Sequence, residues 1–146
     1  MKLKEQGERI GRGSMVGWRG RGHAGVGEGE TWRGRRNIGR RPRELFLAGV
    51  AACTAFDVVW ILKRARQPIA DCVVEADGER APAEPKVFTR IHLKYAIAGR
   101  GLDRKQVERA VQLSKEKYCS ATIMLAHSAE ITYDVRIVDG DQVDAE

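Results

Sequence analysis

The strongest pattern along the chain is an apolar run of 18 residues from Leu45 to Leu62, in which polar side chains are few. Pro42 suits the first turn of a helix because its missing N–H needs no partner there, and Glu44 in the same turn complements the positive end of the helix dipole. Basic residues follow the run, and Pro68 cannot continue a helix. The pattern predicts one long helix that starts at Pro42, ends before Pro68 and is apolar on nearly every face.

This apolar run must also be considered as a membrane span, because 18 residues is near the lower limit for crossing a bilayer. Asp57 lies inside the run, and basic residues flank both of its ends without an orientation bias. We therefore favour a buried core helix and expect no membrane partner. Only about 80 residues follow it, and an intertwined homodimer would supply the remaining cover that such a helix needs.

After Pro68 the spacing of apolar positions changes from that of a helix to that of strands. Residues 69–76 are rich in small and β-branched side chains and predict a short strand, followed by a loop rich in Gly and Pro. Apolar and polar residues then alternate over residues 87–97, which indicates a half-buried strand. Its inner face is predicted to carry Val87, Ile91, Leu93, Tyr95 and Ile97.

The last third of the chain predicts two helical pieces and a strand. Asp103 is an N-cap candidate for a helix that should stop or kink near Cys119, where Ser120 can cap a second piece. Apolar residues alternate again over residues 131–137. The order helix, strand, strand, helix, strand predicts an α+β fold, in which a buried central helix and a second helix pack on an antiparallel sheet.

Charge is spread unevenly along the chain. Residues 1–40 contain ten Lys or Arg against four acidic residues and hold 11 of the 16 glycines, so the net charge of +6 belongs to this segment. Such a composition buries too little apolar surface to offset the entropy of ordering, and we expect a basic Gly/Arg-rich segment that is largely irregular. A neutral domain at residues 41–138 and an acidic tail at residues 139–146 follow.

No charged N-terminal region is followed by an apolar segment and a small-residue cleavage site, so no secretory signal is predicted and a cytoplasmic location is expected. In that reducing compartment, paired cysteines are more often catalytic or redox-sensing than structural. The three histidines have no metal-site spacing and there is no Cys-x-x-Cys pair, so neither a metal nor a cofactor is predicted.

Two of the three cysteines have contrasting settings. Cys53 lies within the apolar run, whereas Cys119, 66 residues later, ends a charged amphipathic segment. If the fold brings them together, the pair suits a thiol peroxidase, in which one thiolate attacks and the other cysteine resolves. From the residues alone, two separate buried thiols remain an alternative. Cys72, on a short apolar strand, is expected to be a small core residue.

Three segments carry a resemblance to a known family. PRELFLAGVAACTAFDVV at 42–59 resembles the central-helix motif of the OsmC/Ohr family of osmotically inducible and organic hydroperoxide resistance proteins. VFTRIHLKYAIAGRGLD at 87–103 and ERAVQLSKEKYCSATIML at 108–125 are similar to the later strand and the second-cysteine helix of that family. The resemblance implies an OsmC-like intertwined homodimer that reduces organic hydroperoxides, with Cys53 attacking, Cys119 resolving and an unknown dithiol reductant recycling the pair.

A peroxidatic cysteine must be a thiolate, and an apolar pocket alone raises a thiol pKa, so a nearby cation is needed. Glu44 matches the family's carboxylate at the start of the central helix but lies two and a half turns from Cys53. We therefore expect Glu44 to anchor an arginine, across the dimer. The segment that supplies this arginine in the family shows no strand pattern here, so the arginine cannot be assigned from the sequence.

Other interpretations stay open. Asp57 lies one turn beyond Cys53 and is expected to form a structural ion pair. The same fold could serve as a non-catalytic redox-sensing or binding dimer. Arg and Gly residues together with Trp18 and Trp32 resemble disordered segments that bind single-stranded RNA, although two short clusters in an otherwise neutral chain make nucleic acid the less favoured partner.

Overall fold

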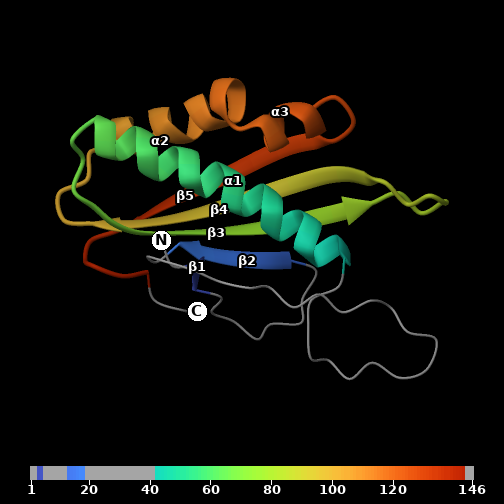
Figure 1. Ribbon diagram of the computed structural model, residues 1–146, viewed down its shortest axis with the longest axis horizontal. Helices are drawn as coiled ribbons and strands as arrows, with labels where there is room; N and C mark the ends of the chain where they lie inside the picture. Colours follow the sequence, from blue (N-terminus) through green and yellow to red (C-terminus); the bar gives the residue numbers. More distant parts are fainter. Residues whose placement is uncertain (1–2, 5–12, 19–41, 144–146) are drawn as a thin grey trace.

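The computed structural model describes residues 3–4, 13–18 and 42–143. They form a sheet with its helices on one side (Figure 1). In chain order the elements are β1 (Leu3–Lys4), β2 (Gly13–Trp18), α1 (Pro42–Arg64), β3 (Ile69–Arg80), β4 (Phe88–Gly99), α2 (Arg104–Leu113), the π-helical turn η1 (Ser114–Tyr118), α3 (Ser120–Leu125) and β5 (Glu130–Val138). The predicted α+β class and the central helix are confirmed.

The five strands lie in the order β1-β2-β3-β4-β5, and every neighbouring pair is antiparallel except β4 and β5. The expectation of a wholly antiparallel sheet is therefore wrong at one edge. β5 runs parallel to β4 because α2, η1 and α3 form a crossover between them that returns the chain to the same end of the sheet. The same crossover lays α2 and α3 beside α1 on one face of the sheet (Figure 1).

Part of the basic N-terminal segment forms strands. The prediction of irregular structure is wrong for residues 13–18, which pair with β3 in a register that runs from Gly13 opposite Asp77 to Trp18 opposite Cys72. The main chain makes these bonds, so a glycine-rich strand can pair without the alternation that a sequence pattern detects. Apart from β1, the remainder of residues 1–40 lies outside the described residues, as do residues 144–146 of the acidic tail.

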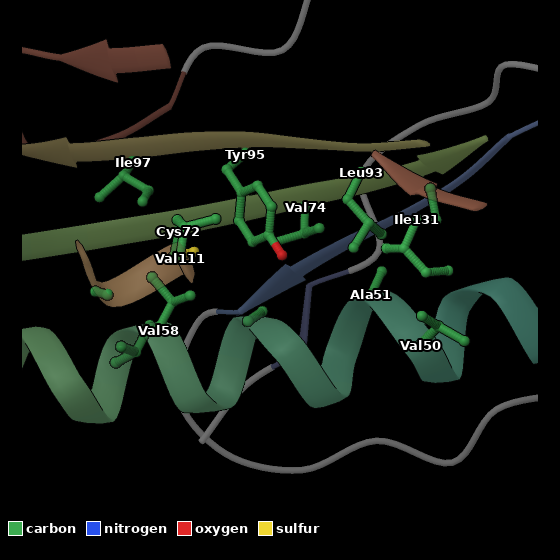
Figure 2. Close-up of a cluster of buried hydrophobic side chains, with 14 of the residues drawn as sticks. Val50, Ala51, Val58, Cys72, Val74, Leu93, Tyr95, Ile97, Val111 and Ile131 are labelled. Carbon is green, nitrogen blue, oxygen red and sulfur yellow. The ribbon is translucent and has the colours of Figure 1, made fainter. Parts of the chain in front are cut away.

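The core lies between α1 and the sheet. In Figure 2, side chains from α1, such as Val58 and Ala51, face Tyr95 and Leu93 from β4. The alternation predicted for β4 is confirmed at four of its five inner positions, which are all buried: Ile91, Leu93, Tyr95 and Ile97. Val87 is the exception, because β4 begins one residue later and Val87 lies exposed in the preceding loop.

Two aspartate side chains accept hydrogen bonds from main-chain amides, one at the start of α2 and one in the segment after β5. Asp103 accepts a hydrogen bond from the Lys105 amide and is the N-cap of α2, as predicted. After β5, the amide of Val143 donates to Asp71 Oδ2 at 3.0 Å, and Val143 is itself buried. The beginning of the acidic tail thus packs against the start of β3.

One face of α1 is not covered by the sheet. The exposed apolar stripe of this helix follows the spacing of its turns and comprises Leu45, Gly49, Phe56 and Trp60. By length and composition, Arg43–Arg64 also meets the requirements for a membrane span, a test that the core helix of a water-soluble protein passes as well. Here the opposite face of α1 is buried, with Leu47, Val58 and Leu62 against the sheet or α2.

Candidate active site

Cys53 lies in the middle of α1 and is half-buried. Cys119 lies between η1 and α3, where its φ and ψ of −77° and 101° leave the helical region and make it the N-cap of α3. Its amide donates to the carbonyl of Ser114, five residues earlier, at 2.7 Å. This π-type turn breaks the predicted second helix where the sequence indicated a kink, and it directs Cys119 toward α1.

The fold brings the two predicted cysteines together and adds a carboxylate that was not predicted to belong to the site. The Sγ atoms of Cys53 and Cys119 and a carboxylate oxygen of Asp57 all lie within 4.8 Å of one another. Cys53 and Asp57 are neighbours because they are four residues apart on α1. Cys119 reaches them from the crossover, so the cluster forms only in the folded chain.

Burial controls the chemistry of Cys119. Desolvation raises the pKa of this thiol to about 11, against hydrogen bonds from Thr122 that lower it, and the neighbouring Cys53 raises it further. Cys119 is fully buried, whereas part of Cys53 reaches solvent. At neutral pH Cys119 is therefore a protonated thiol, a poor nucleophile toward an incoming substrate.

Asp57 is an unusual carboxylate for the middle of an apolar helix. Burial raises its pKa, and a hydrogen bond from Ser114 partly offsets that effect. Its Oδ2 atom is buried and accepts no hydrogen bond from the part of the chain that the structure describes. No ion pair of Asp57 occurs among the described residues, so the expectation of a structural ion pair is wrong there. The cost of burying an unsatisfied carboxylate oxygen marks the position as a functional candidate.

A line of hydroxyl groups connects Asp57 to the core. Thr54 Oγ1 lies 2.7 Å from the Tyr95 hydroxyl and 2.8 Å from Ser114 Oγ. A carboxylate only accepts hydrogen bonds, so the arrangement that satisfies every member has Tyr95 donating to Thr54, Thr54 to Ser114 and Ser114 to Asp57. These four groups fix the position of α1 relative to β4 and η1, and with it the cysteine pair.

Thr54 is the shared member of this network, so removing its hydroxyl should cost more than removing that of Tyr95. We expect Thr54→Val to lower the free energy of unfolding by about 2–3 kcal/mol, because it leaves the Tyr95 hydroxyl buried without a partner. Tyr95→Phe keeps the Thr54–Ser114 bond and should cost about 1 kcal/mol. Urea denaturation of both variants measures the difference, and equal losses would contradict the network.

Two other predicted residues lie outside the cluster. Cys72 is fully buried, and burial and the adjacent Asp71 raise its pKa to about 12, so the prediction of an inert core thiol is supported. Glu44 is half-buried in the first turn of α1. Nine residues of helix place Glu44 about 13 Å along the axis from Cys53. A direct contact within one chain is therefore excluded.

The pKa shifts in the cluster come from burial, hydrogen bonds and the neighbouring thiol. Neither Asp57 nor Cys119 has its pKa shifted by a positive charge from the described part of the chain. A surface hollow between α2 and β5 has neither cysteine of the cluster nor Asp57 in its lining. That hollow encloses about 520 Å³ and is lined by Lys105, Glu108, Arg109, Gln112, Tyr133, Asp134 and Val135.

Comparison with known sequences decides the family. The profile of the family described as OsmC-like protein matches residues 35–134, more than half of the chain. The chain belongs to the OsmC-like family. Protein YhfA of Escherichia coli K12 is 42% identical to this chain over 97 residues, which are 66% of this chain and 72% of that protein.

Solved structures agree with the OsmC-like fold. A hypothetical protein from Aquifex aeolicus matches with a TM-score of 0.67 and 33% identity, over 71% of this chain and 78% of that one. The organic hydroperoxide resistance protein OhrB of Bacillus subtilis matches with a TM-score of 0.53 and 22% identity, over 68% and 73% of the two chains. The second likeness concerns the fold alone, and it agrees with the family resemblance found in the sequence.

Proposed function

We propose that this OsmC-like protein is a thiol-dependent peroxidase that reduces organic hydroperoxides, with Cys53 attacking and Cys119 resolving. The observation that carries the proposal is the approach of their Sγ atoms within one chain, from elements far apart in sequence. The difference in exposure gives each cysteine its role. Cys53 is the thiol that a substrate can reach, and Cys119 is held as a buried thiol behind it.

The proposed reaction has three balanced steps. The Cys53 thiolate attacks the terminal oxygen of the hydroperoxide, the O–O bond breaks, and the alkoxide takes a proton to leave as an alcohol while Cys53 becomes a sulfenic acid. The Cys119 sulfur then attacks the sulfenic sulfur, and water leaves as the disulfide forms. A dithiol reductant exchanges with that disulfide, which restores both thiols and oxidises the reductant.

The surroundings of Cys53 favour an organic rather than a small polar peroxide. Phe56 and Trp60 on the same helix are 49% and 45% exposed, and Trp60 packs edge-on against Tyr118 with ring centroids 6.4 Å apart. An apolar substituent of a hydroperoxide would gain about 25 cal/mol for each Å² that it buries on such a surface. Hydrogen peroxide has no such group and would gain nothing.

A homodimer belongs to the same proposal. The exposed stripe of α1 continues over Phe46, Tyr118 and Met124, and it borders the half-buried Cys53. A second copy of the chain would cover this surface and enclose the thiols between subunits. Across that interface, Glu44 could orient an arginine toward Cys53, which it cannot do along its own helix. We likewise propose a cytoplasmic location, where dithiol reductants are present.

A second function fits one specific observation. No positive charge of the described residues shifts the pKa of Cys119 or of Asp57, and a chain that lacks an activating arginine would react slowly with peroxide. The same pair would then serve as a redox sensor, in which the disulfide changes the packing of α1 against η1. Turnover separates the two functions, since a sensor forms the disulfide without rapid catalysis.

The test of the proposed function is an organic hydroperoxide assay on purified protein with a dithiol reductant. We expect reductant-dependent consumption of cumene hydroperoxide, with slower consumption of hydrogen peroxide. Peptide mapping after brief oxidation should show a Cys53–Cys119 disulfide within one chain. A bridge to Cys72, or consumption of peroxide without any bridge, would contradict the assigned roles.

A further inference from the structure

We propose that the reduced protein binds a thiophilic divalent cation of the Zn²⁺ class through Cys53 Sγ, Cys119 Sγ and the carboxylate of Asp57. This site is distinct in function from peroxide reduction, although it uses the same two thiols. The carboxylate of Asp57 lies beside both thiols but has no role in the proposed peroxidase reaction.

The spacing of the three ligand atoms is suitable for tetrahedral coordination. With Zn–S bonds of about 2.3 Å and a Zn–O bond of about 2.1 Å, tetrahedral geometry places ligand atoms about 3.5–3.8 Å apart. The atoms of this cluster all lie within 4.8 Å of one another, so small side-chain rotations close the set. The half-buried position of Cys53 leaves a direction open to solvent for a fourth ligand, such as water.

A second observation points to a cation independently of the spacing. Asp57 Oδ2 is buried with no hydrogen-bond donor among the described residues, although nearly all buried carboxylate oxygens in proteins are paired. Within the described part of the chain, the hydrogen bond to this carboxylate comes from the Ser114 side chain. A bound divalent cation would pair with the orphaned oxygen and would compensate the charge of two thiolates as well.

The donor set selects the kind of metal. Two thiolates and one carboxylate favour Zn²⁺ and its close analogues over Mg²⁺ or Ca²⁺, which prefer oxygen ligands in larger numbers. Cys53 and Asp57 lie on one helix, four residues apart, and Cys119 is held by a turn in which its amide donates to the Ser114 carbonyl. The fold therefore holds the three ligand residues near one another before a metal binds.

Metal binding and thiol oxidation exclude each other. A Cys53–Cys119 disulfide has no thiolate to offer, so the oxidised protein should not bind the cation. If the metal-loaded form meets an organic hydroperoxide, the balanced outcome is a disulfide, an alcohol, water and a free cation, with two protons consumed. The binding itself needs no peroxide, so it can be tested whether or not the proposed peroxidase activity exists.

The experiment is an anaerobic titration of the full reduced chain with Co²⁺, a spectroscopic substitute for Zn²⁺. We expect thiolate-to-cobalt charge-transfer absorption that saturates at one Co²⁺ for each chain and is displaced by Zn²⁺. The same chain oxidised with diamide keeps its fold and should show no such absorption. Absence of the bands from reduced protein, or their presence in oxidised protein, would overturn the proposal.

Variants then test the third ligand. Asp57→Asn should weaken Co²⁺ binding at least tenfold, since even outer-shell changes cost about 10–100-fold in metal affinity. Glu108→Gln, which removes an exposed carboxylate from α2, and Cys72→Ala, which removes a sulfur outside the cluster, should leave the affinity unchanged. Unchanged binding by a folded Asp57→Asn variant would overturn the assignment of Asp57.

A measurement on the unaltered protein covers the case in which Asp57→Asn does not fold. X-ray absorption of the Zn²⁺-loaded wild-type chain should show two sulfur ligands at about 2.3 Å and oxygen or nitrogen ligands at about 2.0–2.2 Å. Three or four sulfur ligands would assign the metal to another set of cysteines, and none would place it outside this cluster. Either result would refute the proposed site.

Discussion

Cys53→Ser is expected to abolish hydroperoxide turnover, with a loss of several orders of magnitude, because it removes the only group that forms the covalent intermediate. A serine hydroxyl is not ionised at neutral pH and cannot form a sulfenic acid. The substitution changes one atom on a half-buried position of α1, so the fold should persist. The measurement is steady-state consumption of cumene hydroperoxide with a dithiol reductant, beside a circular dichroism spectrum of each variant.

Two further cysteine variants make this result specific. Cys119→Ser should still undergo one oxidation and leave Cys53 as a sulfenic acid that dimedone traps, since the first step does not need the resolving thiol. Cys72→Ala, which alters a buried thiol outside the cluster, should retain turnover. Equal activity in Cys53→Ser and wild type would refute the mechanism, and so would dimedone labelling of Cys119 in place of Cys53.

The sequence predicts the central helix and the cysteine pair well, for physical reasons that are visible in particular residues. The apolar run from Leu45 to Leu62, with Pro42 before it and Pro68 after it, favours one helix packed against a sheet. The alternation around Tyr95 likewise defines the inner face of β4. The kink near Cys119 was predictable because Ser120 begins a new turn, and the structure adds that the turn is π-helical.

Three features of the structure depend on tertiary contacts, and the sequence pattern gives little indication of them. The parallel direction of β5 is decided by the length of the crossover, which a strand pattern does not encode. Strand β2 pairs through its main chain, so its glycine-rich sequence gave no alternation to detect. Asp57 was visible as an i+4 neighbour of Cys53, but its unsatisfied oxygen follows from burial by η1 and could not be predicted from spacing.

The assignment of Glu44 shows where a resemblance stops short of a mechanism. The family motif identifies this carboxylate, and the helix geometry then separates it from Cys53 by about 13 Å. At that distance the residue can act on the thiol only through another group, such as an arginine of the same chain or of a second copy. The oligomeric state of the protein distinguishes these two sources, so the proposed dimer is the next feature to test.

Phe56→Glu is expected to dissociate the proposed homodimer. Phe56 is 49% exposed at the centre of the apolar stripe of α1, so a second copy that covers the stripe would bury the new carboxylate without a partner. An uncompensated buried charge costs about 3 kcal/mol or more, which corresponds to a rise of about a hundredfold in the dimer dissociation constant. Sedimentation velocity at several protein concentrations measures that constant directly.

Ala83→Glu is the matched control, because it adds the same charge in the exposed loop between β3 and β4. It should leave the dissociation constant unchanged. A Phe56→Glu protein that stays dimeric under dilution would show that the stripe of α1 is not the interface. A wild-type chain that sediments as a monomer would also refute the homodimer.

The dissociated variant can show whether disulfide formation and the activation of Cys53 both need the second subunit. Cys53 and Cys119 come from the same chain, so a folded Phe56→Glu monomer should still form their disulfide when treated with diamide. Peroxide reactivity should nevertheless fall if a group from the second subunit supplies the cation that holds the Cys53 thiolate. Full peroxidase activity in a monomer would instead place the activating charge within the same chain, and any role of Glu44, two and a half turns from Cys53, would then have to act through a residue of that chain.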